Sequence, residues 1–263
     1  MGAWGAGLYS NDDASDLVEL LKAVLKLPME IDELIELMKR EMLEDGDEIE
    51  LTFWLVLADQ LEKKGLRHEA TTAKAISILE NQTDIDELRN LDMAESDLVT
   101  RVKYNEKMLA RLRSPRPEKL RKTLNAPQAS VVAANDLLTF PTQNGKSRNP
   151  YFPVGKEMFE ADGWGLAQVH EVGHEFGYLN WISIFTLSWP NTHMPSFDEA
   201  VLSPITGPLC YGTLSKSHFK KMEIVSLGNA DQRSDAPLFE KGHTARSAAL
   251  SDVSISNAFL WLS

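Results

Sequence analysis

The hydrophobic period of this sequence changes once along the chain, and this change constrains the fold more than any other feature. Up to residue 113, apolar residues recur every three or four positions, as at Leu17, Leu20 and Leu21, which is typical of an amphipathic helix with one buried face. Beyond residue 128, apolar and polar residues alternate over short segments, as they do in strands. Two periods in separate parts of the chain predict an α+β fold.

The same change predicts two domains. Pro115 and Pro117 stand among arginine and lysine residues in a segment that has neither period, which indicates a linker. The length of 263 residues agrees, because it exceeds the usual size of one domain. We therefore expect an acidic helical domain over residues 1–113, a Pro/Arg linker over 114–128 and a β-rich domain over 129–263.

Five apolar repeats in the first domain predict five helices. Asn11 and Asp12 can cap the first helix, Pro28 ends it, and Gly65 ends the third. Short loops between such helices are typical of an antiparallel bundle. The repeats run from Leu17 to Leu25, Ile31 to Leu43, Phe53 to Leu61, Ala70 to Leu79 and Leu98 to Leu112.

In the second domain, turn signals such as Asn144-Gly145 and Gly228-Asn229 separate short alternating segments. Several short strands of this kind predict a small twisted sheet or a partly open barrel. A short helix is expected over residues 196–202. The expected strands are Ser130–Ala134, Asp136–Phe140, Gly165–Val172, Tyr178–Leu187, Phe219–Leu227 and Val253–Leu262.

The composition predicts a soluble cytoplasmic protein. Hydrophobic residues make up 43% of the chain, enough for a real core, and no apolar run approaches the roughly 20 residues of a membrane span. The N-terminus lacks the basic start and apolar centre of a signal peptide, and the lone Cys210 cannot form an internal disulfide. No phosphate-binding loop, dinucleotide-binding glycine pattern or G-x-S-x-G motif occurs, so we expect no cofactor.

Acidic residues are concentrated in the first domain. Residues 1–113 hold 25 acidic and 14 basic side chains, a net charge of −11, whereas residues 114–263 hold 14 and 13. This charge would repel nucleic acid and would steer a basic protein partner towards the chain. An acidic, solvated surface without any partner is the open alternative. The densest acidic cluster consists of Glu44, Asp45, Asp47, Glu48 and Glu50.

One short motif suggests metal chemistry. His170, Glu171 and His174 spell H-E-x-x-H, which in zinc peptidases puts two histidines on one helical face and a glutamate beside the attacking water. A third ligand is required, and the metzincin spacing puts Asn180 there, whose amide is a poor ligand for zinc. Glu199 is the candidate in the other zinc-peptidase arrangement. A zinc metallopeptidase is therefore an alternative function.

The flanks of this motif favour another structure. The segment WISIFTL alternates as a strand does, and Gly173 and Gly177 bracket a five-residue turn. A hairpin of residues 165–172 with residues 178–187 accounts for both flanks at once. We therefore expect neither a metal site nor a catalytic residue in this segment.

Two stretches of the first domain resemble a domain of unknown function that is widespread in bacteria. Members of that family begin Met-Gly-Ala-Trp-Gly and continue with an Asn-Asp-Asp-Ala run, as the opening MGAWGAGLYSNDDASD does here. The segment FWLVLADQLEKKGLRHEA, residues 53–70, is similar to a helix pair of the same proteins. No chemistry is known for that family, so this resemblance implies a fold element and no activity.

The second domain is similar to a family of immunity proteins from polymorphic toxin systems, which act in competition between bacteria. The matching pieces are NDLLTFPTQNGK at 135–146, GWGLAQV at 163–169 and YGTLSKSHFKKMEIVSLG at 211–228. The resemblance implies an antidote that binds a cognate toxin, whether contact-dependent or secreted, and occludes its active site without catalysis.

On this resemblance we expect a 1:1 complex with the toxin domain. The acidic cluster would steer a basic toxin, and the loops around residues 144–152 and 170–176 would enter its active site. The side chains expected at the contact are Glu44, Asp45, Asp47, Glu48, Glu50, Asn144, Arg148, Tyr151, His170, His174 and Glu175.

Overall fold

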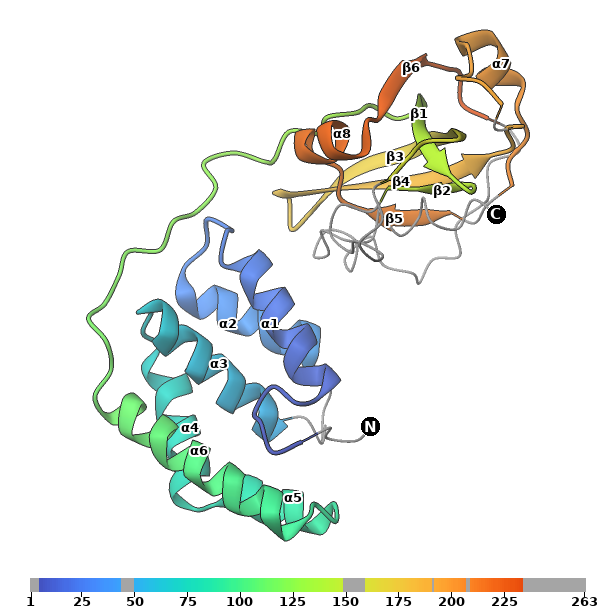
Figure 1. Cartoon of the computed structure of the whole chain (residues 1–263). Helices are drawn as coiled ribbons and strands as arrows, with labels where there is room; N and C mark the ends of the chain where they lie inside the picture. Colours follow the sequence, from blue (N-terminus) through green and yellow to red (C-terminus); the bar gives the residue numbers. More distant parts are fainter. Residues whose placement is uncertain (1–4, 44–49, 149–158, 191, 207–208, 234–263) are drawn as a thin grey trace. The chain divides into compact units, whose positions relative to one another are not determined.

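The computed structural model describes residues 5–43, 50–148, 159–190, 192–206 and 209–233 (Figure 1). The chain divides into two compact units, Met1–Asn125 and Ala126–Ser263. The first unit is helical and the second is built on an antiparallel sheet, so the predicted α+β class is confirmed. No helix within the described residues is both long enough and apolar enough to span a membrane.

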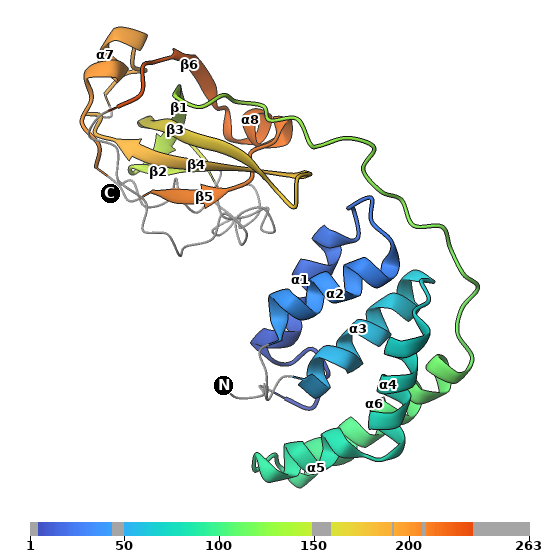
Figure 2. The same cartoon turned by 180° about the vertical axis from the view of Figure 1, so that it is seen from behind.

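Helix α3 lies at the centre of the helical unit, where it contacts α1, α4 and α6 (Figures 1 and 2). Its buried side chains point in several directions around the helix, which is expected of an element covered on more than one side. The described helices of this unit are α1 (Asp12–Val24), α2 (Ile31–Met42), α3 (Glu50–Lys64), α4 (Glu69–Glu80), α5 (Thr83–Asn90) and α6 (Glu95–Arg113).

The five predicted helices are present, and α5 is an addition that the apolar pattern missed. Asn11 caps α1 as predicted, because its side-chain oxygen accepts a hydrogen bond of 2.7 Å from the backbone of Ala14. Helix α5 has only one buried apolar residue, Ile85, and a buried carboxylate, Asp84. Arg101 and Asn105 of α6, both buried, donate hydrogen bonds to the carboxylate of Asp84. Polar contacts rather than a row of apolar side chains therefore hold α5 against α6.

A buried carboxylate, Asp59 of α3, organises the polar interior of the helical unit. The hydroxyls of Tyr9 and Tyr104 donate to it, and the cationic groups of Lys63 and Arg111 pair with it. Burial alone would raise the pKa of Asp59, but the hydrogen bonds from Lys63, Tyr9 and Arg111 outweigh burial and lower the pKa below its ordinary value of 3.8. The ionised form of Asp59 therefore stabilises the fold.

This carboxylate also joins the opening segment of the chain to helix α3. Tyr9 belongs to the opening segment and Asp59 to residues 53–70, and Gln60 donates a second hydrogen bond of 2.8 Å to the Tyr9 hydroxyl. The ammonium group of Lys63 lies 4.9 Å above the Tyr9 ring. The opening segment is thus held on α3 by polar and cation–π contacts.

The segment that follows α6 packs along the helical unit. The backbone amide of Lys119 donates to the carbonyl of Gly65 at 2.8 Å, and that of Leu124 donates to the carbonyl of Lys26 at 2.7 Å. The guanidinium of Arg121 binds two backbone carbonyls in the turn after α1. The boundary between the two units, after Asn125, falls inside the predicted linker, and the part before it is bound rather than free.

The second unit is an antiparallel sheet that curls into a half-barrel, which confirms the predicted twisted sheet or partly open barrel (Figure 1). Its strand order is β2-β1-β3-β4-β5, and β6 pairs with the same edge of β1 as β2. The described elements are β1 (Asp136–Gln143), β2 (Lys146–Ser147), β3 (Gly163–Glu175), β4 (Leu179–Leu187), α7 (Phe197–Leu202), β5 (Cys210–Gly212), α8 (Lys216–Met222) and β6 (Val225–Asn229).

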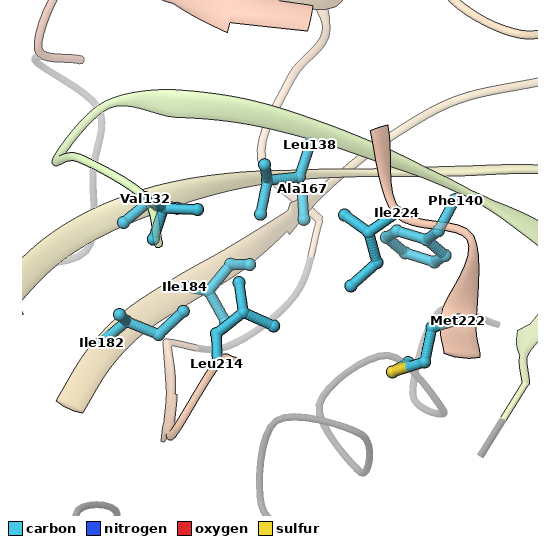
Figure 3. Packing of buried hydrophobic residues seen from close by; sticks show 10 residues of the cluster. Val132, Leu138, Phe140, Ala167, Ile182, Ile184, Leu214, Met222 and Ile224 are labelled. Carbon is cyan, nitrogen blue, oxygen red and sulfur yellow. The ribbon is translucent and has the colours of Figure 1, made fainter. Parts of the chain in front are cut away.

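Both faces of this sheet bury apolar side chains. One face carries a cluster that we call the inner cluster, in which Leu138, Ala167 and Ile184 of the strands lie close to Leu214 and Met222 (Figure 3). The opposite face carries the outer cluster, whose buried members are Leu137, Leu166, Phe185, Leu187 and Ala200. Residues of the inner cluster alternate along β1, β3 and β4 with residues of the outer cluster, as a pleated sheet requires.

Two predicted strands of this unit are wrong in part. Residues 130–134 form bends and turns instead of a strand, and Val131 and Val132 pack on the inner cluster. Residues 219–227 contain the end of α8 and the start of β6, because Ser215 starts a helix there through a capping box with His218. The expected strand at residues 253–262 lies outside the described residues.

The linker contacts predict where proteolysis separates the units. Because residues around Lys119 and Leu124 are hydrogen-bonded to the helical unit, we expect limited proteolysis within residues 114–128 to occur first near the unit boundary. Mass spectrometry of the products should find two fragments, and each should retain its own circular dichroism spectrum. Fragments that unfold together on cleavage would contradict two independent units.

The Asp59 contacts predict a pH-dependent stability. Asp59→Asn removes the charge that Arg111 and Lys63 surround, and we expect it to lower the free energy of unfolding at pH 7 by about 3 kcal/mol. Because the pKa of Asp59 is lowered on folding, its contribution is present above the ordinary pKa of 3.8 and is lost as the pH falls through the lower folded value. Urea unfolding followed by tryptophan fluorescence should therefore show the two proteins converging in acid.

The exposed pair of Asp86 with Arg89 provides the matched control. Asp86→Asn should change the free energy of unfolding by less than about 0.5 kcal/mol at every pH. An Asp59→Asn protein as stable as the wild type at pH 7 would show that the network is not stabilising.

Candidate functional site

The H-E-x-x-H motif lies in β3, in the hairpin with β4 that its flanks predict. In the register of that hairpin Glu171 faces Ser183 and His174 faces Asn180. The hairpin prediction is confirmed, and the motif has extended backbone. Zinc peptidases hold their metal with histidines one helical turn apart, and this segment does not provide that geometry.

A β-bulge separates the two histidines of the motif. The pairing of β3 with β4 skips His170, which is an extra residue in β3. Val169 and Val172 therefore both pack on the inner cluster, although they are three residues apart. His170 lies on the other face, with its ring 6.0 Å from that of Phe185 in the outer cluster, whereas His174 follows Val172 by two positions and shares its face. The two imidazoles are thus on opposite faces of the sheet.

His174 has a structural hydrogen bond. Its Nε2 lies 2.7 Å from the backbone carbonyl of Gln128, which can only accept, so the ring nitrogen is the donor. Gln128 in turn donates its backbone amide to the carbonyl of Tyr178 and accepts at Oε1 from the backbone of Asn180. His174 and Asn180 together fix the start of the sheet unit across the end of the β3–β4 hairpin.

The remaining motif residues are also explained by packing. A side chain at Gly173 would overlap the indole ring of Trp181, which is directly opposite in the register. The ring of Trp181 in turn lies 5.9 Å from that of Tyr211. Burial, and then the negative charge of Glu171, raise the pKa of Tyr211 to about 12, so its hydroxyl is protonated at neutral pH.

Glu199, the candidate third metal ligand, is engaged within its own helix. It forms a capping box with Ser196 at the start of α7, and its other carboxylate oxygen lies 3.2 Å from Nε2 of His193. Hydrogen bonds from Ser196 and then from His193 lower the pKa of Glu199 to about 2. No group of three or more histidine, cysteine, aspartate or glutamate side chains within the described ranges is arranged to hold a metal ion.

A serine–histidine pair in the sheet unit also has a structural explanation. Ser215 Oγ lies 2.8 Å from Nδ1 of His218, a distance that suits a nucleophile and its base. The same Nδ1 accepts from the backbone amide of Ser215, and the backbone amide of His218 donates to Ser215 Oγ. This reciprocal arrangement is the capping box that starts α8, and His218 is 2% exposed.

The acidic side chains expected to steer a toxin are only partly described. Glu44, Asp45, Asp47 and Glu48 lie outside the described residues. Glu50, the first residue of α3, accepts a hydrogen bond from the Trp54 indole at 3.1 Å and lies 3.4 Å from the ammonium group of Lys74. Glu50 is therefore already paired within the helical unit, which reduces its attraction for a partner.

Two of the three side chains expected in the first contact loop, Asn144 and Arg148, lie in or next to the β1–β2 hairpin. Asn144 has a positive φ of 52° in its turn, and its backbone amide donates to the carboxylate of Asp162. Arg148 is half exposed and lies 3.9 Å from the carboxylate of Glu223. Tyr151 lies outside the described residues.

The structure does not bring the two expected contact loops together. Thr142, next to the β1–β2 turn, faces Gly163 at the start of β3, whereas Glu175 faces Leu179 at the other end of β3. Twelve residues of extended strand separate these ends by roughly 40 Å. Asn144 and Arg148 therefore lie near one end of β3, His174 and Glu175 lie near the other end and His170 lies between them, and their joint contact with a toxin stays a prediction.

A cavity of about 440 Å³ lies elsewhere on the sheet unit, on the side of the outer cluster. Gln168 of β3 lines it together with two apolar residues of α7, Phe197 and Val201. Asn229 at the end of β6 and the residues from Ala230 to Arg233 complete the lining.

Gln168 is the unusual member of this lining. It is 1% exposed, and its Oε1 has no hydrogen-bond partner among the described residues. An unsatisfied buried oxygen of this kind costs about 1–3 kcal/mol. The backbone explains its place, because Gln168 pairs with Leu137 and faces Phe185, so it stands where the outer cluster would otherwise hold an apolar residue.

Next to the cavity, α7 exposes an apolar surface. Leu202 is 83% exposed, and three further large apolar residues of this segment are between one third and one half exposed. We call this set the α7 surface; it consists of Met194, Phe197, Val201 and Leu202. Such a group of apolar side chains beside a cavity is typical of a protein-binding surface.

Sequence reasoning predicted α7 but neither the cavity beside it nor its exposed apolar side chains. A signal was present, because the alternation along β3 puts Gln168 on the same face as Leu166 in an otherwise apolar segment. The exposure of Val201 and Leu202 carried no such signal, because a six-residue helix is too short to show which face is buried.

Comparisons with known proteins found no similar protein: no family model, no curated protein and no solved structure matches this chain.

The opposed faces of the two histidines predict how the protein responds to zinc. We expect no stoichiometric zinc by elemental analysis after exposure to the metal, and no shift of the thermal midpoint on adding it. His174→Ala should lower the free energy of unfolding by about 1 kcal/mol through loss of the Gln128 contact, with or without zinc. One zinc per chain, lost in both His170→Ala and Glu199→Ala, would restore the metallopeptidase alternative.

Proposed function

We propose that this chain is an immunity protein that binds a cognate antibacterial toxin in a 1:1 complex and blocks the toxin's active site. The observation that carries the proposal is the α7 surface beside the cavity. Burying such apolar side chains stabilises a complex, and an aromatic residue next to a cavity is a frequent centre of binding energy. The similarity of residues 135–146, 163–169 and 211–228 to immunity proteins supplies the class of partner.

We favour occlusion over catalysis because the histidine, glutamate and serine side chains that could take part in catalysis make structural contacts in this fold. His174, Glu199 and the Ser215–His218 pair each hold backbone or capping contacts. These contacts give each of the residues a structural role, and no group of three or more histidine, cysteine, aspartate or glutamate side chains among the described residues is arranged to hold a metal ion. For the same reason a metallopeptidase is not proposed as a second function.

The charge distribution supports fast capture of a basic toxin. The net charge of −11 over residues 1–113 attracts a positively charged partner over distances of about 10 Å at moderate salt. The cluster around Glu44–Glu50 is the densest part of this charge and remains the proposed steering region. We propose that the encounter takes place in the cytoplasm, with a toxin that acts there.

The α7 surface can be tested with one substitution and a matched control. Leu202→Asp puts a charge on the proposed contact and should weaken binding of the cognate toxin domain at least tenfold, about 1.4 kcal/mol or more. Leu91→Asp, at another exposed leucine on the helical unit, should leave binding unchanged. Isothermal titration with the cognate toxin domain measures both affinities, and growth on co-expression with that toxin measures protection.

Both variants should retain the wild-type thermal midpoint because both leucines are exposed. Equal toxin binding by Leu202→Asp and the wild type would remove α7 from the interface. Protection at sub-stoichiometric amounts, with the toxin left unbound or its damage reversed, would contradict occlusion and indicate an enzyme that repairs the target.

A further inference from the structure

The β-bulge in β3 decides on which face of the sheet Glu171 lies. Val169 packs on the inner cluster, and in a regular strand Glu171, two residues later, would share its face. The extra residue reverses this, because Glu171 is paired with Ser183, which alternates along β4 with residues of the inner cluster. Glu171 is exposed, and no residue in the described part of the chain forms a hydrogen bond or an ion pair with its carboxylate.

Two partly exposed aromatic side chains share this face with Glu171. Tyr211 of β5 is paired with Ser183, so Glu171, Ser183 and Tyr211 form one row across three strands. Trp181 stands two residues from Ser183 in β4, and its indole lies across Gly173, where a Cβ atom would be 2.3 Å from a ring carbon. The ring centroids of Trp181 and Tyr211 are 5.9 Å apart, and the ring planes are inclined by 48°.

The charge of Glu171 acts on this aromatic pair. Neighbouring strands lie about 4.8 Å apart, so the backbones of Glu171 and Tyr211 are about 10 Å apart, within reach of two long side chains. After burial, the negative charge of Glu171 is the second cause that raises the pKa of Tyr211 to about 12. Tyr211 is therefore neutral at pH 7, and the faces of both aromatic rings attract cations as the carboxylate does.

We propose that Glu171, Trp181 and Tyr211 bind an arginine side chain of the protein partner. A guanidinium group stacks on an aromatic ring and donates two parallel hydrogen bonds to a carboxylate, which the ammonium group of lysine cannot do. The carboxylate of Glu171 has no such partner within the described residues, so it is available for this pair. The motif that spells a zinc site thus contributes its glutamate to the recognition of a cation.

The position of these side chains on the sheet indicates that the arginine belongs to a protein. Phe185 and Leu187 of β4 lie on the same face as Trp181 and pack with Ala200 of α7 in the outer cluster. Six residues of strand, about 20 Å, separate Leu187 from Trp181. A protein contact of ordinary size covers about 800 Å² on each partner and spans roughly 30 Å, so one partner can cover both this site and the α7 surface.

The inference rests on the proposed function for the identity of the partner, namely the toxin. The preference of the site for a guanidinium group can be measured without the toxin.

The first test uses two probes that differ in charge. Nα-acetylarginine methylamide carries a guanidinium group, and Nα-acetylcitrulline methylamide carries a neutral urea of nearly the same shape. In nitrogen-edited NMR of the full-length protein at constant ionic strength, the arginine probe should shift the indole N–H signal of Trp181 in a saturable manner. The citrulline probe should bind about tenfold more weakly. Equal binding of the two probes, or no saturable shift with the arginine probe, would overturn the assignment.

The second test removes the charge of Glu171 and keeps the shape of its side chain. Glu171→Gln should weaken binding of the arginine probe and of the toxin about tenfold each, and it should leave the thermal midpoint unchanged because the residue is exposed. Glu160→Gln is the matched control, since Glu160 is an exposed glutamate that precedes β3 in the same unit. It should change neither affinity.

The outcomes separate the arginine site from the proposed function. If Leu202→Asp weakens toxin binding and Glu171→Gln does not, the immunity function stands and the arginine site is wrong. If the arginine probe binds through Glu171 but the wild-type protein does not bind the toxin, the site stands and the proposed function is wrong. On the toxin, replacing the bound arginine by methionine should weaken the complex with the wild type and should add nothing to the effect of Glu171→Gln.

Discussion

The bulge at His170 is the constraint on which the architecture of the sheet unit depends. Val169 and Val172 are three residues apart, and a regular strand would turn them to opposite faces. With one extra residue between them, both reach the inner cluster opposite Ile184 and Ile182. The apolar area gained by burying both valines favours the bulge over a regular ladder. The residues that spell a metal-binding motif in the sequence form, in the fold, a β-bulge that changes which residues of β3 face the inner cluster.

A different principle holds the helical unit together. Its central helix buries a carboxylate, Asp59, and surrounds it with hydroxyl and cationic donors from the opening segment, from α3 itself and from α6. A buried charge is tolerated when its lone pairs are satisfied in this way, and it then ties distant segments to one point. The opening residues and the segment 53–70 are therefore coupled physically.

Both units contain buried polar atoms without a hydrogen-bond partner in the part of the chain that the structure describes. In the helical unit Asp59 is compensated by several donors, but Oδ1 of Asn105 has no hydrogen-bond partner among the described residues. In the sheet unit the same holds for Oε1 of Gln168 and Oγ of Ser147. Each such atom lowers the free energy of unfolding by about 1–3 kcal/mol.

The sequence by itself determined the elements with a strong period: the five apolar helices, strands β1, β3 and β4, and the hairpin around residues 170–178. These depend on local patterns, which a single chain displays. Helix α5 and the α8–β6 segment could not be predicted from the apolar pattern. Asp84 holds α5 through hydrogen bonds to α6, and Ser215 starts α8 through a capping box, and neither contact appears as an apolar repeat in the sequence. The candidate site was decided by tertiary structure alone. Whether Gln168 finds a donor, whether Leu202 is covered, and on which face His170 lies all depend on segments that meet only after folding.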